Sequence, residues 1–236
     1  CIRDRDYTLP SLVHAGYRVI ALDHRGCGMS DKDFADMSIS AIADDVVALA
    51  GHLGLDSVAL NGWSLGGAVA VEAAAALQAR CSALVLTCAA TPCYLQKADF
   101  PHGGTEEAMS ETLAAMSADR VNFLRALSVG VCAKEVSEQM VQWMWSSFLD
   151  ASPMAAQSLA QLGPLDQRST LAELSMPVLS FVGSLDAVVD PAVCRSVGNY
   201  HTNTQTIEFE HAGHAPFIEE SVAYNQALVE FLNTHL

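Results

Sequence analysis

The most informative part of the chain is SVALNGWSLGGAVAVEAAAAL (57–77), in which a strand-like run passes through a glycine-rich turn into a helix-like run. The residues after the turn are rich in alanine, the strongest helix former. The turn itself contains the pattern Gly-x-Ser-x-Gly, formed by Gly62, Ser64 and Gly66. A serine on a sharp turn between a strand and a helix predicts a nucleophilic hydroxyl exposed at the edge of a sheet.

The small residues of this turn have a steric role. We expect Gly62 and Gly66 to prevent collisions across the turn, and Gly67 to let the helix pack close to the strands. The N–H of Leu65, at the helix start, is the expected donor to a negatively charged reaction oxygen. The alternative is a surface loop with chance glycines, and the flanking strand and helix argue against it.

Outside this stretch, short apolar runs alternate with helical runs. The predicted strands are 17–23, 57–62 and 82–89, and the predicted helices between them are 40–53 and 65–79. Near-continuous apolar strands joined by helices are typical of a mostly parallel sheet with helices on both faces. The predicted fold class is therefore α/β.

The strand pattern stops at residue 91 and resumes near residue 175. The helical stretches in this interval are 105–118, 119–130 and 134–150, and later come strands at 177–183 and 204–210 and a helix at 221–236. We interpret the interval as an inserted helical cap. The chain then has an N-terminal part of the core (1–90), the cap (91–174) and a C-terminal part of the core (175–236).

Composition indicates a globular protein and excludes several partners. Of the 236 residues, 51% are hydrophobic and 17% are charged, with a mean hydropathy of +0.24. Twelve basic and 27 acidic residues give a net charge of −15, which repels nucleic acid and anionic membranes. No run reaches the roughly 18 apolar residues of a membrane span. A homo-oligomer is compatible with this composition.

The cysteines suggest neither a disulfide framework nor a zinc site. They are odd in number, scattered and never spaced as C-x-x-C. The seven are Cys1, Cys27, Cys81, Cys88, Cys93, Cys132 and Cys194. We expect reduced, mostly buried thiols without a catalytic role, which fits a cytoplasmic location.

A nucleophilic serine needs a base and a group that orients the base. On strand-turn-helix hydrolytic sites these follow in the order serine, acid, histidine. Asp186 comes directly after the strand 177–183, at the sheet edge where parallel-sheet active sites assemble. Asp190 is the competing acid, but an aspartate before Pro191 is typical of a helix N-terminus. We therefore predict that Asp186 orients the base.

Two histidines follow the strand 204–210. We predict that His214 is the base, since it follows Gly213 in the loop beyond the strand, and that His211 is structural or solvated. An H-x-x-H metal site is the alternative for the pair, and no third ligand motif accompanies it. We expect neither a metal nor a cofactor.

With Ser64, Asp186 and His214 in this order, the chain resembles the α/β-hydrolase superfamily. ALDHRGCGMSD (21–31) and GHAPFIEES (213–221) look like two further segments of that family. Segments of the cap, such as 91–103 and 143–156, are similar to bacterial arylesterases and cofactor-free haloperoxidases, which are better called perhydrolases. The resemblance implies ester cleavage through an acyl-enzyme, with Leu65 as one oxyanion donor.

Two features depart from the family pattern. Trp63 precedes the serine where histidine or phenylalanine is usual. The family also places a central strand ending in His-Gly between the strands that match 17–23 and 57–62, and the loop after it supplies the second oxyanion N–H. We find no such strand among the first sixteen residues. We therefore expect the sequence to be incomplete at its N-terminus and the visible chain to be a weak catalyst.

The cap is expected to roof the site and select the substrate. Trp143 and Met144 belong to an apolar helix face that includes Met140 and Phe148, and we predict that both, with Trp63, line the acyl pocket. No cationic cluster is apparent near the triad, so the expected substrate is a small or medium neutral ester or lactone. The alternatives are perhydrolysis at the same site and a non-catalytic ligand-binding protein on this fold.

Overall fold

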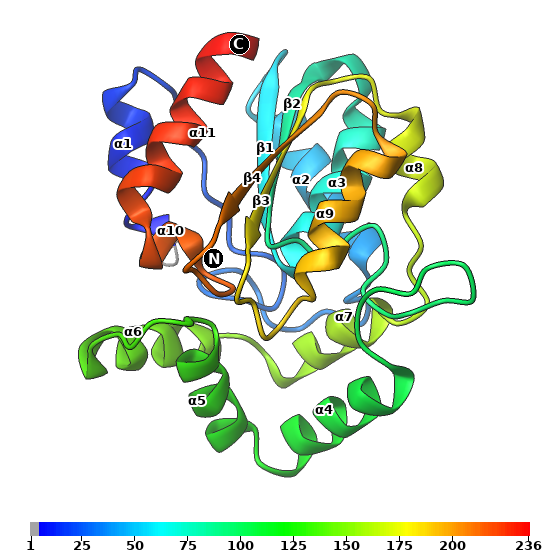
Figure 1. Cartoon of the computed structure of the whole chain (residues 1–236), viewed down its shortest axis with the longest axis vertical. Helices are drawn as coiled ribbons and strands as arrows, with labels where there is room; N and C mark the ends of the chain where they lie inside the picture. The colour runs from blue at the N-terminus through cyan, green and yellow to red at the C-terminus, as the bar shows by residue number, and fades with distance from the viewer. Residues whose placement is uncertain (1–4) are drawn as a thin grey trace.

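The computed structural model describes residues 5–236 and contains a four-stranded parallel sheet in the order β1-β2-β3-β4 (Figure 1). The strands are β1 (Val58–Trp63), β2 (Cys81–Thr87), β3 (Val178–Gly183) and β4 (Thr204–Phe209). The helices are α1 (Leu9–His14), α2 (Ile39–His52), α3 (Leu65–Leu77), α4 (Glu106–Ala118), α5 (Arg120–Gly130), α6 (Glu138–Leu149), α7 (Ala156–Gln161), α8 (Arg168–Glu173), α9 (Pro191–Tyr200), α10 (Pro216–Glu219) and α11 (Ser221–His235). Short 3-10 turns lie at Gln78–Arg80 and Pro153–Ala155.

The sheet is covered on both faces, as the apolar strands predict. Helices α3 and α9 pack on one face with α2 beside α3, while α11 and α1 lie on the other (Figure 1). Every residue of β3 is buried, and β2 is buried almost throughout. The outer strands β1 and β4 are more exposed. The α/β prediction with helices on both faces is confirmed.

One predicted strand is wrong. No strand is assigned over 17–24, although the segment follows α1 and runs beside the core. It lies across a cavity of about 730 Å³ whose walls include residues 17–22 on one side and 58–63 on the other. A strand is defined by hydrogen bonds to a neighbour, and across this cavity the segment has no adjacent strand to bond. The strand that the family resemblance places between these two segments stays a prediction.

The interval 91–174, which the sequence predicts to be an inserted cap, is mainly helical, and its last helix packs on the core. Helices α4 to α7 lie beneath the sandwich, on the side where the strands end (Figure 1). Helix α8 instead packs against α3 and α9. The predicted helices 105–118 and 119–130 match α4 and α5 closely, and α6 begins later than predicted because the Ser137 hydroxyl caps its first turn by accepting from the Met140 N–H.

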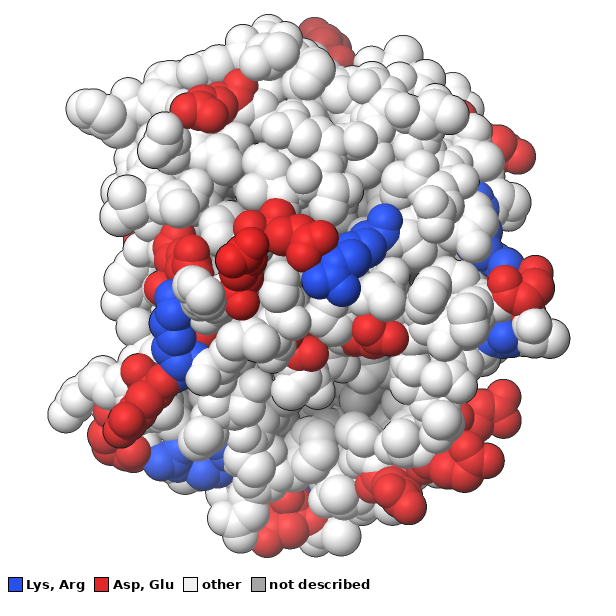
Figure 2. Space-filling model, in the orientation of Figure 1, with Lys and Arg blue, Asp and Glu red and all other residues white. Residues whose placement is uncertain are grey.

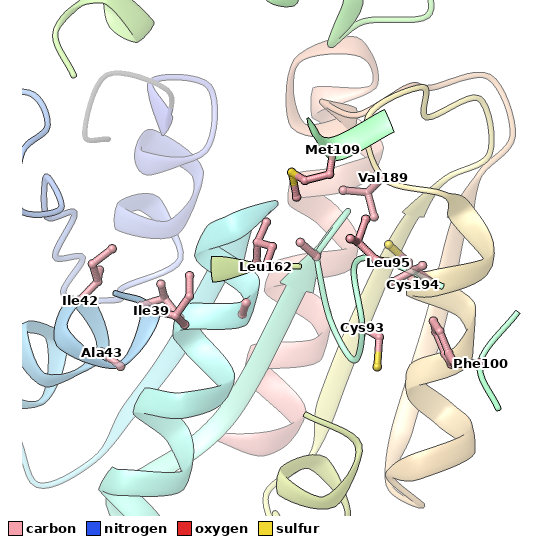
Figure 3. Close-up of a cluster of buried hydrophobic side chains, with 14 of the residues drawn as sticks. Ile39, Ile42, Ala43, Cys93, Leu95, Phe100, Met109, Leu162, Val189 and Cys194 are labelled. Carbon is pink, nitrogen blue, oxygen red and sulfur yellow. The ribbon is translucent and has the colours of Figure 1, made fainter. Parts of the chain in front are cut away.

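The cap is joined to the core by a buried cluster of apolar side chains. Met109 of α4 and Leu162 after α7 pack with Ile39 and Ile42 of α2 (Figure 3). The segment after β2 also contributes to the cluster, with Cys93, Leu95 and Phe100. Burial on this scale makes the cap part of one hydrophobic core.

The surface agrees with the acidic composition. On the face shown in Figure 2, acidic side chains outnumber basic ones, and most of the surface is uncharged. Within residues 5–236, no helix combines the length and the apolar character needed to span a bilayer.

Candidate active site

Ser64 sits on a strained turn between β1 and α3. Its backbone has φ 56° and ψ −126°, in a region that side-chain-bearing residues rarely adopt. The turn is held by the Ser64 N–H, which donates to the Thr87 carbonyl at 3.1 Å, and by the Ser64 carbonyl, which accepts from the Ala90 N–H at 3.0 Å. These bonds fix the serine at the ends of β1 and β2. The strain is compensated by the surrounding packing, as is usual at active sites.

The structure confirms the steric roles predicted for Gly62 and Gly67 but not the one predicted for Gly66. A Cβ on Gly62 would lie 2.2 Å from the Gly66 carbonyl oxygen, and one on Gly67 would lie 2.3 Å from the Ala89 Cβ. Both positions therefore require glycine. A Cβ on Gly66 would meet nothing closer than the His24 Cε1 at 3.8 Å. The prediction of a collision at Gly66 is wrong, because this residue already faces the cavity beside β1.

The loop after β3 holds Asp186 by its backbone. One carboxylate oxygen, Oδ1, accepts from the N–H groups of Val188 at 2.8 Å and Val189 at 3.0 Å. The competing acid, Asp190, caps α9 by accepting from the Ala192 N–H at 2.9 Å. Asp190 is therefore a helix cap, as predicted, and the orienting role of Asp186 stays a prediction.

The loop after β4 places His214 against Asp186. The His214 Nδ1 lies 2.7 Å from Asp186 Oδ2, and the two side chains are 2% and 1% exposed. A buried carboxylate at this distance orients the ring and stabilises an imidazolium. His211 is exposed and lies outside this pair.

Trp63 links the serine turn to the histidine loop. Its indole Nε1 donates to the His214 carbonyl at 2.7 Å, and the two rings lie 5.1 Å apart. Since Trp63 directly precedes Ser64, this contact fixes the turn relative to His214. The three predicted catalytic residues thus lie on loops that meet at the ends of β1, β3 and β4.

The nucleophile candidate borders the large cavity, whereas the acid–base pair is buried. Ser64, Trp63 and Leu65 line the cavity of about 730 Å³, and His24 and Phe148 also contribute to its wall. Leu65 is the first residue of α3, where backbone N–H groups have no acceptor within the helix. This is the position expected of an oxyanion donor, and the role of Leu65 stays a prediction.

The structure separates the other predicted pocket residues from this cavity. Met144 is 3% exposed and packs within the core formed with Phe181 and Tyr224, so it does not reach the cavity wall. Trp143 lines a different, smaller pocket, where its ring meets Tyr7 edge-on at 6.4 Å. The apolar face of α6 is therefore used mainly for packing, because it lies against the core.

A cation lies closer to the site than the sequence suggested. The Arg5 guanidinium is 4.5 Å from the Phe217 ring centroid and 5.7 Å from that of Trp63. Both distances are within the range of cation–π attraction. Arg5 is a single cation beside the Trp63 and Phe217 rings and forms no cationic cluster there, and it follows a segment outside the described residues.

Cys88 is a site residue that the sequence did not reveal. It directly follows β2 with φ 43°, and its sulfur lies within 4.8 Å of the ligand atoms of Asp186 and His214. Complete burial raises the pKa of this thiol well above its ordinary value, and the nearby Cys194 and Asp186 add to the shift. The thiol is therefore protonated. No short motif surrounds Cys88, so only the fold could have identified it.

The cluster of Cys88, Asp186 and His214 has the residue types of a metal site. Its His214 Nδ1 already faces Asp186 Oδ2 in a hydrogen bond, so a metal there would replace the contact that orients the ring. The arrangement fits an acid–base pair better than a ligand set. His211 does not belong to this cluster, so the cluster is not the H-x-x-H site considered from the sequence.

Comparison with known proteins establishes the family. The model of the α/β hydrolase fold family matches residues 4–221, and the chain belongs to this family. Proteins similar to this chain include esterases and a bromoperoxidase. A pimeloyl-[acyl-carrier protein] methyl ester esterase of Aliivibrio fischeri is 30% identical over 93% of this chain and 84% of its own length.

Two solved structures are similar over nearly the whole chain. The esterase EaEST from Exiguobacterium antarcticum superposes with a TM-score of 0.92 at 27% identity, covering 98% of this chain and 87% of its own. A bromoperoxidase from Bacillus anthracis gives a TM-score of 0.94 at 26% identity, with the same two coverages of 98% and 87%. The resemblance to α/β hydrolases of the esterase and haloperoxidase type is thereby confirmed.

Proposed function

We propose that this protein hydrolyses a small or medium neutral carboxylic ester or lactone through Ser64, His214 and Asp186. The observation that carries the proposal is the buried 2.7 Å contact between His214 and Asp186, tied through Trp63 to the strained turn of Ser64. The three side chains have the chemistry and the chain order of a serine hydrolase triad. Esterases among the similar proteins support the same reaction class.

In this mechanism His214 removes the Ser64 proton as Oγ attacks the ester carbonyl carbon. Asp186 keeps the Nδ1 proton of the imidazole in place and stabilises the resulting charge. The oxyanion is stabilised by the N–H of Leu65 and the positive end of α3. The alkoxide then leaves with the proton from His214. Water, deprotonated by His214, attacks the acyl carbon. The bond to Ser64 Oγ then breaks, His214 returns the proton to Oγ, and the acid is released.

The cavity that borders Ser64 supports this choice of substrate class. Its wall includes the apolar side chains of Trp63, Leu65 and Phe148. Most of the lining is apolar, with Arg5 and Arg18 as its charged side chains, and a mainly apolar wall favours a neutral acyl group. The Arg5 guanidinium is already stacked on Phe217 and Trp63, so it does not change this choice. The methyl ester esterase among the relatives is compatible with a small leaving alcohol.

Perhydrolysis is the second candidate, favoured by the similarity to a bromoperoxidase. In that reaction hydrogen peroxide replaces water in the attack on the acyl-enzyme, and a peracid is released. The first half of the mechanism is identical for both reactions.

A cytoplasmic location is part of the proposal, and the free cysteines of the described chain support it. The unpaired cysteines are Cys27, Cys81, Cys88, Cys93, Cys132 and Cys194.

The test is covalent labelling of the whole chain with a fluorophosphonate, together with turnover of p-nitrophenyl acetate. We expect labelling and turnover in the wild type, and Ser64→Ala to lose the label and at least about 10⁴-fold of the rate. Ser184→Ala is the matched control, because this serine lies in the loop before Asp186 and should retain both. A wild type that neither labels nor turns over would support the non-catalytic alternative. Added peroxide with peracid detection separates the two enzymatic candidates.

A further inference from the structure

Glu219, at the end of α10, connects the histidine loop to the cap. Its Oε1 accepts from the Gly213 N–H at 2.7 Å, directly before His214. Its Oε2 accepts from the N–H groups of Ala133 at 2.7 Å and Lys134 at 2.9 Å, in the loop between α5 and α6. One carboxylate therefore satisfies backbone donors from two segments that are about 80 residues apart in the chain.

The two loops also touch without any space between their backbones. A Cβ on Gly213 would lie 2.7 Å from the Ala133 nitrogen and 3.2 Å from the Val131 carbonyl oxygen. On its other side, the Gly213 carbonyl oxygen would lie 1.8 Å from a Cβ on Gly183, at the end of β3. The histidine loop is thus held between the cap and the strand that carries Asp186. A shift of the cap loop cannot be absorbed locally, because packed backbones transmit displacement.

The charge of Glu219 makes this junction stronger than neutral contacts would. Hydrogen bonds from N–H groups to a carboxylate are about twice as strong as neutral ones. Burial and the Glu219 charge together raise the pKa of Cys132 to about 12, with burial as the larger cause. Cys132 directly precedes Ala133 and Lys134, the two cap residues whose N–H groups Glu219 accepts.

We propose that Glu219 is a positioning residue that couples the cap to His214. Through its three backbone contacts it holds the cap loop 131–134 and the histidine loop in a single arrangement. A change in the position of the cap then changes the position of the His214 ring relative to Ser64. The consequence for catalysis rests on the proposed function, whereas the coupling of the two loops does not.

The adjacent Glu220 provides a matched control. Its Oε1 pairs with the Lys134 Nζ at 3.0 Å, between side chains that are 25% and 44% exposed. This pair also connects the start of α11 to the cap, and Glu220 has the same charge as Glu219. Within residues 5–236, the Glu220 side chain accepts from Lys134 Nζ and from no backbone N–H of the histidine loop. Surface pairs of this kind contribute little to stability.

The first experiment measures amide hydrogen exchange in the whole chain for E219Q and E220Q. In E219Q we expect the amides of Gly213, Ala133 and Lys134 to exchange about 10- to 100-fold faster, because glutamine offers one acceptor oxygen in place of two. The effect should appear in both loops together and be larger in E219A. Unchanged exchange in E219Q, or faster exchange in only one loop, would overturn the coupling.

The second experiment measures kcat and KM per labelled active site. If Glu219 positions His214, E219Q lowers kcat for p-nitrophenyl acetate about 10- to 100-fold with little change in KM, while E220Q stays within two-fold of the wild type. A merely structural role would lower the melting temperature and leave kcat per labelled site unchanged, which contradicts the proposal. A wild type without labelling would refute the proposed function, and the exchange experiment would still decide the coupling.

Discussion

The two lateral sides of the sheet, here called the β1 end and the β3–β4 end, differ in how closely neighbouring backbone segments approach each other. At the β3–β4 end, the backbones of Gly183 and Gly213 pass so close that a single added methyl group would overlap the neighbouring carbonyl. At the β1 end, residues 17–22 stand across a cavity of about 730 Å³ from the strand. One end is closed by backbone contact, and the other is open.

This difference divides the proposed catalytic residues into two groups. Asp186 and His214 belong to the closed end, where their side chains are almost completely buried. Ser64 and Leu65 lie at the border of the open end and line the cavity. The geometry of the acid–base pair is therefore fixed by packing and by the hydrogen bonds of its two loops, whereas the surroundings of Ser64 include the open cavity beside β1. Substitutions at the two ends should accordingly have unequal effects.

The largest contrast is expected between alanine substitutions of two glycines. Gly183→Ala places a Cβ 1.8 Å from the Gly213 carbonyl oxygen, so strand and loop must separate, at a cost of about 3 kcal/mol or more. Gly66→Ala meets no atom closer than 3.8 Å and adds a helix former to α3, so we expect no loss of stability. Denaturant unfolding measures both.

The activity of the same two variants sharpens the comparison. Gly183→Ala should also lose most of its turnover per folded molecule, since the displaced loop carries His214. Similar destabilisation by both variants would show that the cavity side is as tightly packed as the β3–β4 side.

The sequence predicted the closed end better than the open end, for a physical reason. Strands with continuous apolar runs, such as β2 and β3, are specified by local pattern. The loops with Asp186 and His214 follow β3 and β4, and both were located from the sequence. The strand predicted at 17–23 has the same apolar pattern, yet pattern alone cannot supply the neighbour to which a strand must bond. The error therefore arose where structure depends on a distant segment.

The same reasoning explains the site residues that were misplaced or missed. Met144 and Trp143 have the composition of a pocket wall, but whether an apolar helix face meets a cavity or a core is decided by tertiary packing. The roles of Cys88 and Glu219 depend on contacts between segments far apart in the chain. The steric roles of Gly62 and Gly67 were predicted from the motif, and only the three-dimensional turn shows that Gly66 has no such close contact.

A smaller contrast is expected between two valine-to-alanine substitutions on strands. Val182 in β3 is fully buried, so Val182→Ala leaves a cavity and should lower the free energy of unfolding by about 2 kcal/mol. Val58 in β1 is half-buried and already faces the open cavity, so Val58→Ala should cost less than about 1 kcal/mol. Urea unfolding with an unchanged m-value is the measurement. Equal losses would contradict the distinction between the two ends.

The smallest effect is expected from charge at the closed end. Arg195 donates to Glu208 of β4 at 2.9 Å and 2.8 Å, and this contact is the main cause of the lowered pKa of Glu208. A carboxyl group whose pKa is lower in the folded state than in the unfolded state stabilises the protein at pH values above its unfolded-state pKa. This contribution is lost as the pH falls through the folded-state pKa. Both side chains are about two-fifths exposed, at 44% and 40%, so Arg195→Gln should cost at most about 1 kcal/mol at neutral pH.

The open end should depend more on such a pair, since packing there is incomplete. Arg25 binds Asp45 through two contacts of 2.7 Å, donates to the Asp36 carbonyl at 3.0 Å, and is only 16% exposed. We therefore expect Arg25→Gln to be more destabilising than Arg195→Gln at pH 7. The loss of stability in Arg195→Gln should become smaller as the pH falls below the pKa of an ordinary glutamate. The wild type then loses the same contact, because Glu208 becomes protonated. Thermal unfolding at pH 7 and in the acid range tests both points, and a larger loss for Arg195→Gln would mean that charge rather than backbone packing holds the closed end together.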